Sequence, residues 1–225
     1  MSKGYFVTGT DTGVGKTWAS LAIMAHLQQQ GHTVVGMKPV ASGCERVAGG
    51  LRNEDALLIQ QQGSLPLPYD TVNPYAFAPA IAPHIAAKQA KVQIRLDTLR
   101  ADYLQLTQQA EWVIVEGAGG WLVPLNDSDN MADLAKTISL PVVLVVGLRL
   151  GCINHALLSA QSIRAHGCQL AGWIANTLEP QMPCLEENIA SIAARIAAPL
   201  LGILPHQHTL APDDLGQHLR LSGST

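Results

Sequence analysis

The sequence predicts an α/β protein whose doubly wound, mostly parallel sheet carries a phosphate-binding loop. Short apolar runs rich in Val, Ile and Leu alternate with longer helical patterns, as in parallel sheets covered by helices on both faces. The first run leads directly into a glycine-rich segment at residues 9–17. The chain has 225 residues, 48% of them apolar, so it can bury one large core, and we expect a single domain over residues 1–225.

Six apolar runs are the expected strands. Pro141 and Pro199 directly precede two of them, at positions where a missing backbone N–H is tolerated. The expected strands are residues 5–8, 33–37, 112–115, 142–146, 170–175 and 200–204.

Helical periodicity falls between these runs, and Gly31 and Gly167 stand where a glycine often ends a helix. The expected helices are residues 16–29, 53–62, 96–109, 130–138, 154–166 and 185–196. Residues 63–83 contain five prolines and little periodicity, so we expect a long ordered loop over the end of the sheet, or alternatively a flexible lid. The tail at residues 207–225 is polar and weakly patterned.

The segment GTDTGVGKT at residues 9–17 is typical of a loop that holds nucleotide phosphates. Its glycines let successive N–H groups face one anion, and the helix that follows adds its positive dipole end. Lys16 would reach the outer phosphates, and the Thr17 hydroxyl would bind Mg²⁺. The usual spacing places a glycine at position 10, where this chain has threonine and where Gly9 lies one residue early. A chance Gly-Lys-Thr in a turn is the alternative, which the flanking strand and helix patterns disfavour.

Charged residues follow the other expected strands, at the edge where parallel sheets bind ligands. Glu116 leaves the strand at 112–115 and has the position of an acid that holds Mg²⁺, which prefers hard oxygen ligands. Asp55 is a second candidate, although an acid in the first turn of a helix also suits the dipole. Lys38 follows the second strand; unless it is an ordinary surface lysine, it would join Lys16 in neutralising a transferring phosphoryl group.

Composition disfavours several other classes of protein. The net charge is −3 with only 14 Lys and Arg, so we expect no nucleic-acid partner. The most apolar stretch, residues 140–148, is too short for a membrane helix, and the N-terminus has no export pattern, so we expect a cytoplasmic protein without a membrane partner. Four scattered cysteines are expected to be free thiols rather than zinc ligands; they are Cys44, Cys152, Cys168 and Cys184.

Taken in order, these and further segments resemble the dethiobiotin synthetase family over most of the chain. The segments are GTDTGVGKT, GMKPVASG, LRNEDALL, TVNPYAF, APHIAA, VEGAGGWLVPL, LGCINHALL, GWIAN and PLLGILP. The resemblance implies a P-loop NTPase-like ligase of biotin biosynthesis that uses ATP and Mg²⁺. It would carboxylate 7,8-diaminopelargonate with CO₂ and close the ring to dethiobiotin, releasing ADP and phosphate, through a carbamate and a carbamic-phosphoric anhydride. It also implies a homodimer with active sites at the subunit interface.

The resemblance also implies residue roles. Lys16 and Lys38 would be the catalytic cations, and Thr17, Asp55 and Glu116 the Mg²⁺ ligands. ATP would contact Gly13, Val14, Gly15, Lys16, Thr17, Trp18, Asp55, Glu116, Gly117, Ala118, Gly119, Asn176, Thr177, Pro205, His206 and Gln207. The substrate would contact Thr12, Ser42, Gly151, Cys152, Ile153 and Asn154.

Among these residues, Asn176 and the loop at Pro205 would contact the adenine. The turn at residues 151–154 would bind the substrate's carboxylate, brought by the partner subunit, at the start of a helix. That turn is otherwise an ordinary helix cap, and both readings can hold together.

Some positions depart from the family pattern, and other functions compete. Gly13 and Thr177 stand where acidic residues are common, and Ala82 where a serine often occurs, so the preference for ATP over CTP and GTP stays open. A partitioning-type ATPase would need lysine at position 11, where this chain has Asp11. A GTPase would need an Asn-Lys-x-Asp motif, and the nearest stretch is residues 176–179. A cobyrinate-type amide synthase would need an additional glutaminase domain, whereas a nucleotide-binding module without chemistry remains an alternative.

Overall fold

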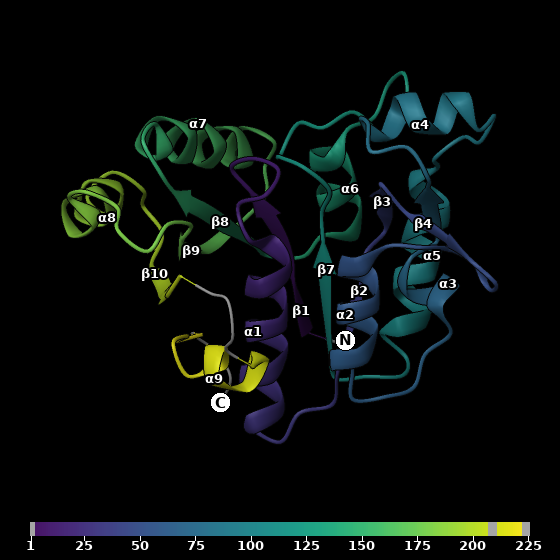
Figure 1. The fold of residues 1–225 in the computed structure, drawn as a ribbon, viewed down its shortest axis with the longest axis horizontal. Coiled ribbons are helices and arrows are strands. Elements are labelled where there is room, and N and C mark those ends of the chain that lie inside the picture. The colour runs from purple at the N-terminus through teal and green to yellow at the C-terminus, as the bar shows by residue number, and fades with distance from the viewer. Residues whose placement is uncertain (1–2, 207–210, 222–225) are drawn as a thin grey trace.

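The computed structural model describes residues 3–206 and 211–221, which build helices around a six-stranded parallel sheet (Figure 1). Neighbouring strands pair in parallel throughout this sheet, so the predicted fold class is confirmed. In spatial order the strands are β10 (Leu200–Leu204), β9 (Leu170–Thr177), β8 (Val142–Leu148), β1 (Lys3–Gly9), β7 (Trp112–Glu116) and β2 (Val34–Met37).

The chain builds the sheet first on one side of β1 and then on the other. From β1 it passes out to β2, returns to β7, and then crosses to β8, β9 and β10. Open parallel sheets bind their ligands at such a reversal, beyond the carboxyl ends of the strands. The register places Val7 beside Glu116 and Gly9 beside Val145, so the phosphate-loop segment emerges next to the end of β7.

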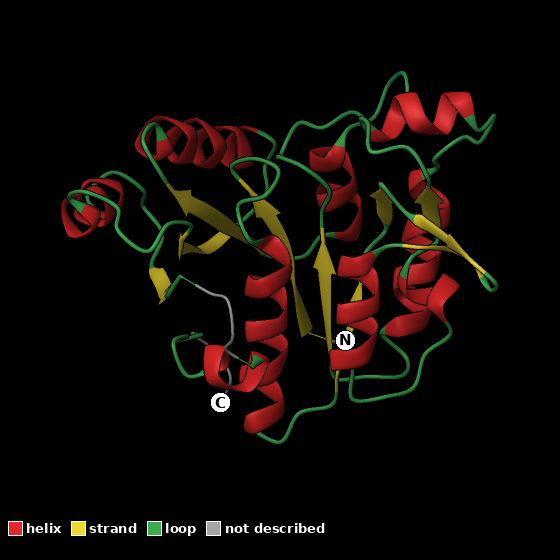
Figure 2. Ribbon diagram, viewed as in Figure 1, coloured by secondary structure: helices red, strands yellow, loops and turns green. Residues whose placement is uncertain are grey.

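Helices cover both faces of the sheet, as Figure 2 shows in red against the yellow strands. Tyr5 and Val7 pack on one face, whereas Phe6 packs on the other, because successive strand residues point to opposite sides. The first face carries α1 (Lys16–Gln29), α2 (Glu54–Gln62) and α9 (Pro212–Gly216). The second carries α4 (Pro83–Gln89), α5 (Leu96–Leu106), α6 (Met131–Ile138), α7 (Cys152–Ala165) and α8 (Leu185–Ala193).

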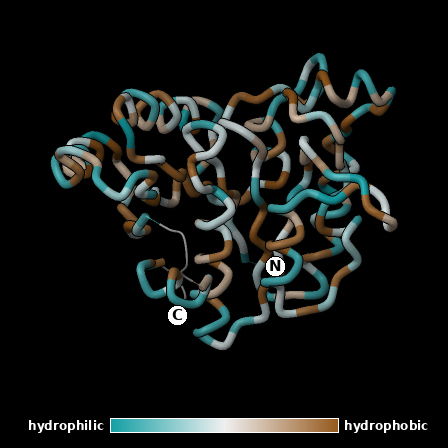
Figure 3. The backbone as a smooth tube through the Cα atoms, viewed as in Figure 1, coloured by the Kyte–Doolittle hydropathy of each residue, from teal (hydrophilic) through white to brown (hydrophobic). Residues whose placement is uncertain are grey.

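Burial on both faces explains why the strands read as continuous apolar runs. Figure 3 shows hydrophobic stretches along the strands and teal stretches at the helix and loop surfaces. The predicted strands are all present, and β10 has the predicted bounds. Helix α1 also has its predicted bounds, whereas α5 ends three residues earlier than expected and α7 begins two residues earlier.

The stretch at residues 63–83 contains a helix and a strand, so the expectation that it is only a loop is wrong. It contains α3 (Tyr69–Val72) and β6 (Tyr75–Phe77), and β6 pairs with β3 (Val40–Ser42). A hairpin of β4 (Glu45–Val47) and β5 (Gly50–Arg52) precedes α2. Elements of three or four residues are too short to show a hydrophobic period, so the sequence pattern did not reveal them.

The described part of the tail is also more structured than its weak pattern suggests. Leu215, Leu219 and Leu221 are buried and pack in the same apolar cluster as α1. The imidazole of His26 in α1 hydrogen-bonds through Nδ1 to the carbonyl of Gly216, at 2.9 Å. A glycine at that position is needed, because a Cβ there would lie 2.9 Å from the backbone nitrogen of His26. The tail therefore docks on α1 through α9 and the close approach at Gly216, and on β10 where Leu219 pairs with Gly202.

Candidate active site

The connection from β1 to α1 has the geometry of a phosphate-binding loop. Gly13 and Gly15 have φ of 72° and 88°, in the left-handed region that favours glycine. A Cβ on Gly9 would lie 2.6 Å from Cγ2 of Val14, so the early glycine allows the loop to fold back on itself. The threonine at position 10 is accommodated, since its N–H donates to the carbonyl of Val145 at 3.0 Å. Helix α1 begins directly after the loop, which leaves its positive end facing this edge of the sheet.

Lys38 is a buried lysine at the centre of an ionic cluster beside this loop. It follows β2 and is 4% exposed. Its Nζ forms an ion pair with Oε1 of Glu116, at the end of β7, and lies 3.3 Å from Oδ2 of Asp55, in the first turn of α2. It also donates to the carbonyl of Gly117 at 3.3 Å. Three separate elements therefore bring together residues that lie up to 78 positions apart in the sequence.

Thr17, Asp55 and Glu116 form a set of oxygens suited to a divalent cation. The Thr17 hydroxyl donates to Oε1 of Glu116 at 3.1 Å. Glu116 is 1% exposed, and its Oε2 has no hydrogen-bond partner within residues 3–206 and 211–221. A buried carboxylate oxygen is costly to leave unpaired. Hydroxyl and carboxylate oxygens beside a phosphate loop are also what Mg²⁺ prefers, so these residues fit a magnesium ion.

The two lysines are in different electrostatic states. Burial, together with the nearby charge of Lys38, lowers the pKa of Lys16 to about 8; its Nζ donates to the carbonyl of Asp11 at 3.0 Å. Burial also lowers the pKa of Lys38, but Glu116 and Asp55 outweigh it and leave that pKa raised. Lys38 is therefore a fixed cation, whereas Lys16 is close to losing its proton at neutral to mildly alkaline pH.

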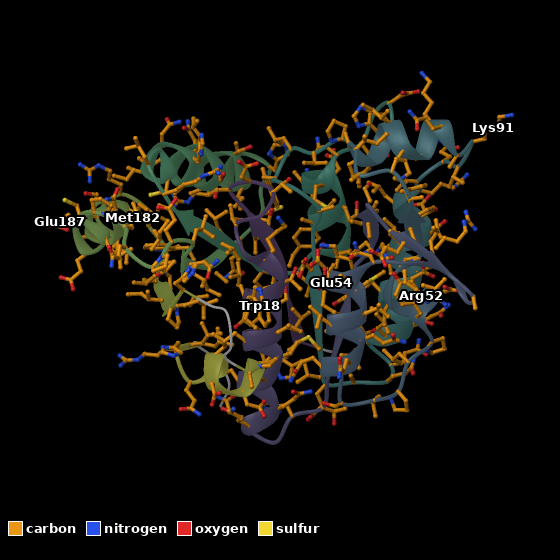
Figure 4. The ribbon with its side chains drawn as sticks, in the orientation of Figure 1. Trp18, Arg52, Glu54, Lys91, Met182 and Glu187 are labelled. Atoms are coloured by element: carbon orange, nitrogen blue, oxygen red, sulfur yellow. The ribbon has the colours of Figure 1, made fainter. Side chains whose placement is uncertain are left out.

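Lys16 and Lys38, together with Thr17 and Asp55, line a pocket of about 770 Å³. Trp18 and Glu54, labelled in Figure 4, belong to α1 and α2 and contribute to its walls. Of the predicted site residues, the pocket brings together Thr12, Gly13, Gly15, Lys16, Thr17, Trp18, Lys38, Ser42, Asp55, Ala118 and Gly119. The Ser42 hydroxyl oxygen is buried and has no hydrogen-bond partner among the described residues.

The pocket also includes residues that sequence reasoning missed. They are Ala41, Asn53, Glu54, Leu58, Ala80, Ile81, Ala82, Pro83 and Val123. Residues 80–83 lead into the first residue of α4 and line one side of the pocket. The segment APHIAA marked this region in the sequence, but its small apolar side chains gave no chemical signal.

Some predicted site residues do not line the pocket within the described ranges, among them Glu116 and Gly117. The carbonyl of Val14, a buried residue, accepts a hydrogen bond from Nδ2 of Asn176 at 2.9 Å. A Cβ on Gly15 would lie 2.1 Å from the same nitrogen. Thr177 is the last residue of β9, Pro205 and His206 follow β10, and Gln207 lies outside the described residues.

The predicted carboxylate turn at residues 151–154 is separate from the pocket. It forms the start of α7, with Gly151 at φ 95° and Cys152 buried. Among the residues that the structure describes, the pocket lining includes none of Gly151, Cys152, Ile153 and Asn154. An ion pair links the two regions, since Arg149 lies 2.5 Å from Asp11 in the phosphate loop.

Comparisons with solved structures agree with this fold. The septum site-determining protein MinD from Pyrococcus horikoshii, complexed with Mg-ADP, superposes with a TM-score of 0.57 at 14% identity, covering 92% of this chain and 82% of its own. The signal recognition particle 54 kDa protein from Aeropyrum pernix, in complex with GDP, gives 0.52 at 15% identity, with 99% and 44% covered. At these identities the likeness shows the fold alone.

Sequence comparisons identify the family. A family model described as an AAA domain matches residues 3–214. The ATP-dependent dethiobiotin synthetase of Cellvibrio japonicus is 51% identical over 220 residues, covering 98% of this chain and 96% of its own. The enzyme of that name from Pseudomonas aeruginosa is 51% identical over 218 residues, with 96% of each chain covered. That from Xanthomonas campestris is 49% identical over 217 residues, with 96% and 97% covered. With such identity over almost the whole chain, the protein belongs to the ATP-dependent dethiobiotin synthetase family.

Proposed function

We propose that this protein carboxylates 7,8-diaminopelargonate with CO₂ and closes the ring to dethiobiotin in the pocket between α1 and α2. One amine attacks the carbon of CO₂ and loses a proton to give a carbamate. A carbamate oxygen attacks the γ-phosphorus of ATP, and ADP leaves. The second amine then attacks the carbonyl carbon of the carbamic-phosphoric anhydride, phosphate leaves and a proton is released. The observation that carries this proposal is the cluster of the buried Lys38, Glu116 and Thr17 with the partly exposed Asp55, beside the phosphate loop.

The two lysines are the proposed catalytic cations. Phosphoryl transfer needs positive charge fixed where negative charge spreads over the phosphate oxygens. Lys38 supplies a charge held in place by three oxygen contacts. Lys16 stands in the loop itself, where a bound triphosphate would replace the Asp11 carbonyl as the partner of its ammonium group and would favour its charged form.

Thr17, Asp55 and Glu116 are the proposed Mg²⁺ ligands. The unpaired oxygen of Glu116 and the Thr17 hydroxyl beside it support this assignment. A bound Mg²⁺ neutralises charge on the phosphate oxygens. The chain's own contribution is to aim these oxygens toward the loop from α1, α2 and β7.

ATP and substrate contacts follow from the same arrangement. The nucleotide would be held by the backbone of residues 13–15 and by the side chains of Lys16, Thr17 and Trp18. Residues 116–119 would contact it from the other side. Asn176, Thr177, Pro205, His206 and Gln207 are the proposed adenine-side residues. Ser42 and Thr12 are the proposed substrate contacts, supported by the unpaired Ser42 hydroxyl in the pocket.

We propose a homodimer in which Gly151, Cys152, Ile153 and Asn154 bind the carboxylate of a substrate that lies in the partner's pocket. Large apolar side chains near this turn support a covered face, because Leu150 is fully exposed and Leu158 of α7 is 56% exposed. We further propose that the chain acts as one domain in the cytoplasm. No helix in the described ranges combines the length and apolar character that a membrane crossing needs.

The test of this proposal is an assay of ADP release with ATP, Mg²⁺, bicarbonate and 7,8-diaminopelargonate. We expect release to depend on the diamine and to yield dethiobiotin by mass spectrometry. Hydrolysis that does not depend on the diamine would instead indicate an ATPase switch. Lys16→Ala and Lys38→Ala should each lose at least about 100-fold in kcat, with Lys136→Ala on the exposed side of α6 as the control.

A further inference from the structure

The main chain of Lys38 is held on both sides by the segment that contains α3 and β6. The N–H of Lys38 donates to the carbonyl of Val72 at 2.8 Å. Its carbonyl accepts a hydrogen bond from Nδ2 of Asn73 at 2.6 Å. The next peptide is held in the same way, because the N–H of Tyr75 donates to the carbonyl of Pro39 at 3.2 Å. The position of Lys38 is therefore fixed by a segment that lies outside the pocket.

A tyrosine connects this support to the helix that carries Asp55. The hydroxyl of Tyr69 donates to Oδ1 of Asn73 at 2.9 Å and accepts from the N–H of Asn53 at 2.7 Å. Asn53 is the N-cap of α2, where its side chain accepts from the N–H of Ala56 at 3.2 Å. Asp55 lies two residues further along, in the first turn of α2. One hydroxyl thus links the start of α2 to the residue that holds Lys38.

The surroundings of Tyr69 keep this link in place. The guanidinium of Arg52, labelled in Figure 4, lies 4.1 Å from the centre of the Tyr69 ring, a distance at which a cation attracts an aromatic face. Asn73 is 2% exposed, and its amide nitrogen also donates to the carbonyl of Tyr75 at 3.3 Å. Burial raises the pKa of Tyr69, so its hydroxyl keeps the proton that it donates.

We propose that Tyr69 and Asn73 are positioning residues that set the Lys38 ammonium and the Asp55 carboxylate at their working separation. The proposal rests on the roles proposed above for Lys38 and Asp55. The side chains of Lys38 and Asp55 meet at 3.3 Å, but Lys38 directly follows β2 whereas Asp55 belongs to α2, and these are separate elements. The chain of contacts from the Lys38 carbonyl through Asn73 and Tyr69 to the N–H of Asn53 joins these two elements. Small displacements of charged groups strongly slow a reaction that depends on their placement.

A purely structural role is the alternative, because buried polar groups need partners in any protein. The two roles differ in what they change. Loss of structural hydrogen bonds lowers the stability of the protein but leaves the turnover of folded molecules unchanged. Loss of positioning lowers kcat in molecules that are fully folded.

The first experiment removes the link without removing bulk. Tyr69→Phe keeps the ring over Arg52 and deletes the hydroxyl, and Asn73→Asp keeps the shape but deletes both N–H donors. Tyr103→Phe is the matched control, because Tyr103 is also buried but lies in α5 on the other face of the sheet. We expect kcat to fall about tenfold in Tyr69→Phe and further in Asn73→Asp, with KM for ATP changed less than about twofold. Tyr103→Phe should keep kcat within about twofold of the unmodified protein.

The second experiment asks whether Tyr69 acts through Asp55. In an Asp55→Asn background, adding Tyr69→Phe should lower kcat by less than about twofold, because residues in one network are not additive. An undiminished tenfold loss in that background would overturn the proposal, as would a Tyr69→Phe kcat equal to that of Tyr103→Phe. Thermal unfolding identifies any variant that does not fold; if Asn73→Asp is one, Tyr69→Phe decides the question.

The same measurements separate this inference from the proposed function. If Lys38→Ala keeps nearly normal turnover, the proposed role of Lys38 fails and the positioning proposal fails with it. If Lys38→Ala loses turnover while Tyr69→Phe does not, only the positioning proposal fails.

Discussion

Asn176 donates its side-chain amide to the carbonyl of Val14, at 2.9 Å, and so ties the end of β9 to the phosphate loop. The amide also packs against Gly15, where a Cβ would collide with its nitrogen. Asn176 therefore shapes the loop directly, in addition to its proposed contact with the adenine.

Replacing Asn176 with alanine should weaken ATP binding more than substrate binding. The Val14 carbonyl would lose its partner and the loop would loosen, so we expect KM for ATP to rise about tenfold and the free energy of unfolding to fall by about 1–2 kcal/mol. Steady-state kinetics with ATP and the diamine varied separately, together with urea unfolding, measure both effects. An unchanged KM for ATP would show that the loop holds its shape without this hydrogen bond.

The buried ammonium group of Lys16 should make stability depend on pH. The pKa of Lys16 is lowered from 10.5 to about 8 in the folded protein, so the unfolded state binds more protons between these values and stability rises with pH through that window. Below pH 8 the charged form is buried at a cost. Lys16→Met should therefore raise the free energy of unfolding at pH 7, by up to about 3 kcal/mol.

Urea unfolding in EDTA, without nucleotide, measures this difference at several pH values. The advantage of Lys16→Met should shrink between pH 8 and 10.5. Equal stability of the two proteins at pH 7 would mean that the buried ammonium group carries no penalty.

Magnesium with ADP should stabilise the protein through Asp55 and Glu116. A ligand that binds only the folded state raises its stability in proportion to the logarithm of its concentration. We expect Mg-ADP to raise Tm by several degrees, and Asp55→Asn and Glu116→Gln to lose most of the part that depends on Mg²⁺. Glu54→Gln is the matched control, because Glu54 also lines the pocket but is not a proposed ligand. If Glu54→Gln lost as much of the Mg²⁺ effect as Asp55→Asn, the loss would reflect the charge of the pocket and not coordination.

The packing of the tail on α1 should contribute to the stability of the whole protein. Leu215 is fully buried against this helix, so Leu215→Ala should lower the free energy of unfolding by about 2–4 kcal/mol. Leu104→Ala, at a position 40% exposed, should cost much less. Thermal and urea unfolding compare the two variants. Similar losses would show that the tail adds no more stability than an exposed leucine does.

Much of the fold and part of the site were predictable, for identifiable reasons. The strands were recognisable in the sequence as continuous apolar runs, because they are buried on both faces. The meeting of Lys38 and Glu116 followed from the rule that ligand-binding residues lie at the carboxyl ends of parallel strands. The local sequence also indicated the phosphate loop, despite Thr10, because its glycines and its helix are contiguous.

Other features depend on contacts between distant segments, which no local pattern encodes. The Tyr69 hydroxyl finds its partners at Asn53 and Asn73 only after α2 and α3 have packed. Asp11 meets Arg149 from 138 positions away. The docking of the tail gave no signal in the sequence, because Leu215, Leu219 and Leu221 have too few apolar neighbours in sequence to form an amphipathic period.

Helix α1 lies between the sheet and α9 (Figure 1), and ten of its fourteen residues are buried. A helix enclosed in this way has little freedom to tilt or slide, because its neighbours on all sides would have to repack. The phosphate loop at the first turn of α1 is therefore held in a fixed position within the protein. The opposite wall of the pocket is more thinly covered, because only Ala56 and Ile59 of α2 are buried and residues 78–81 before α4 are exposed. We therefore expect any rearrangement of the site to occur in that wall.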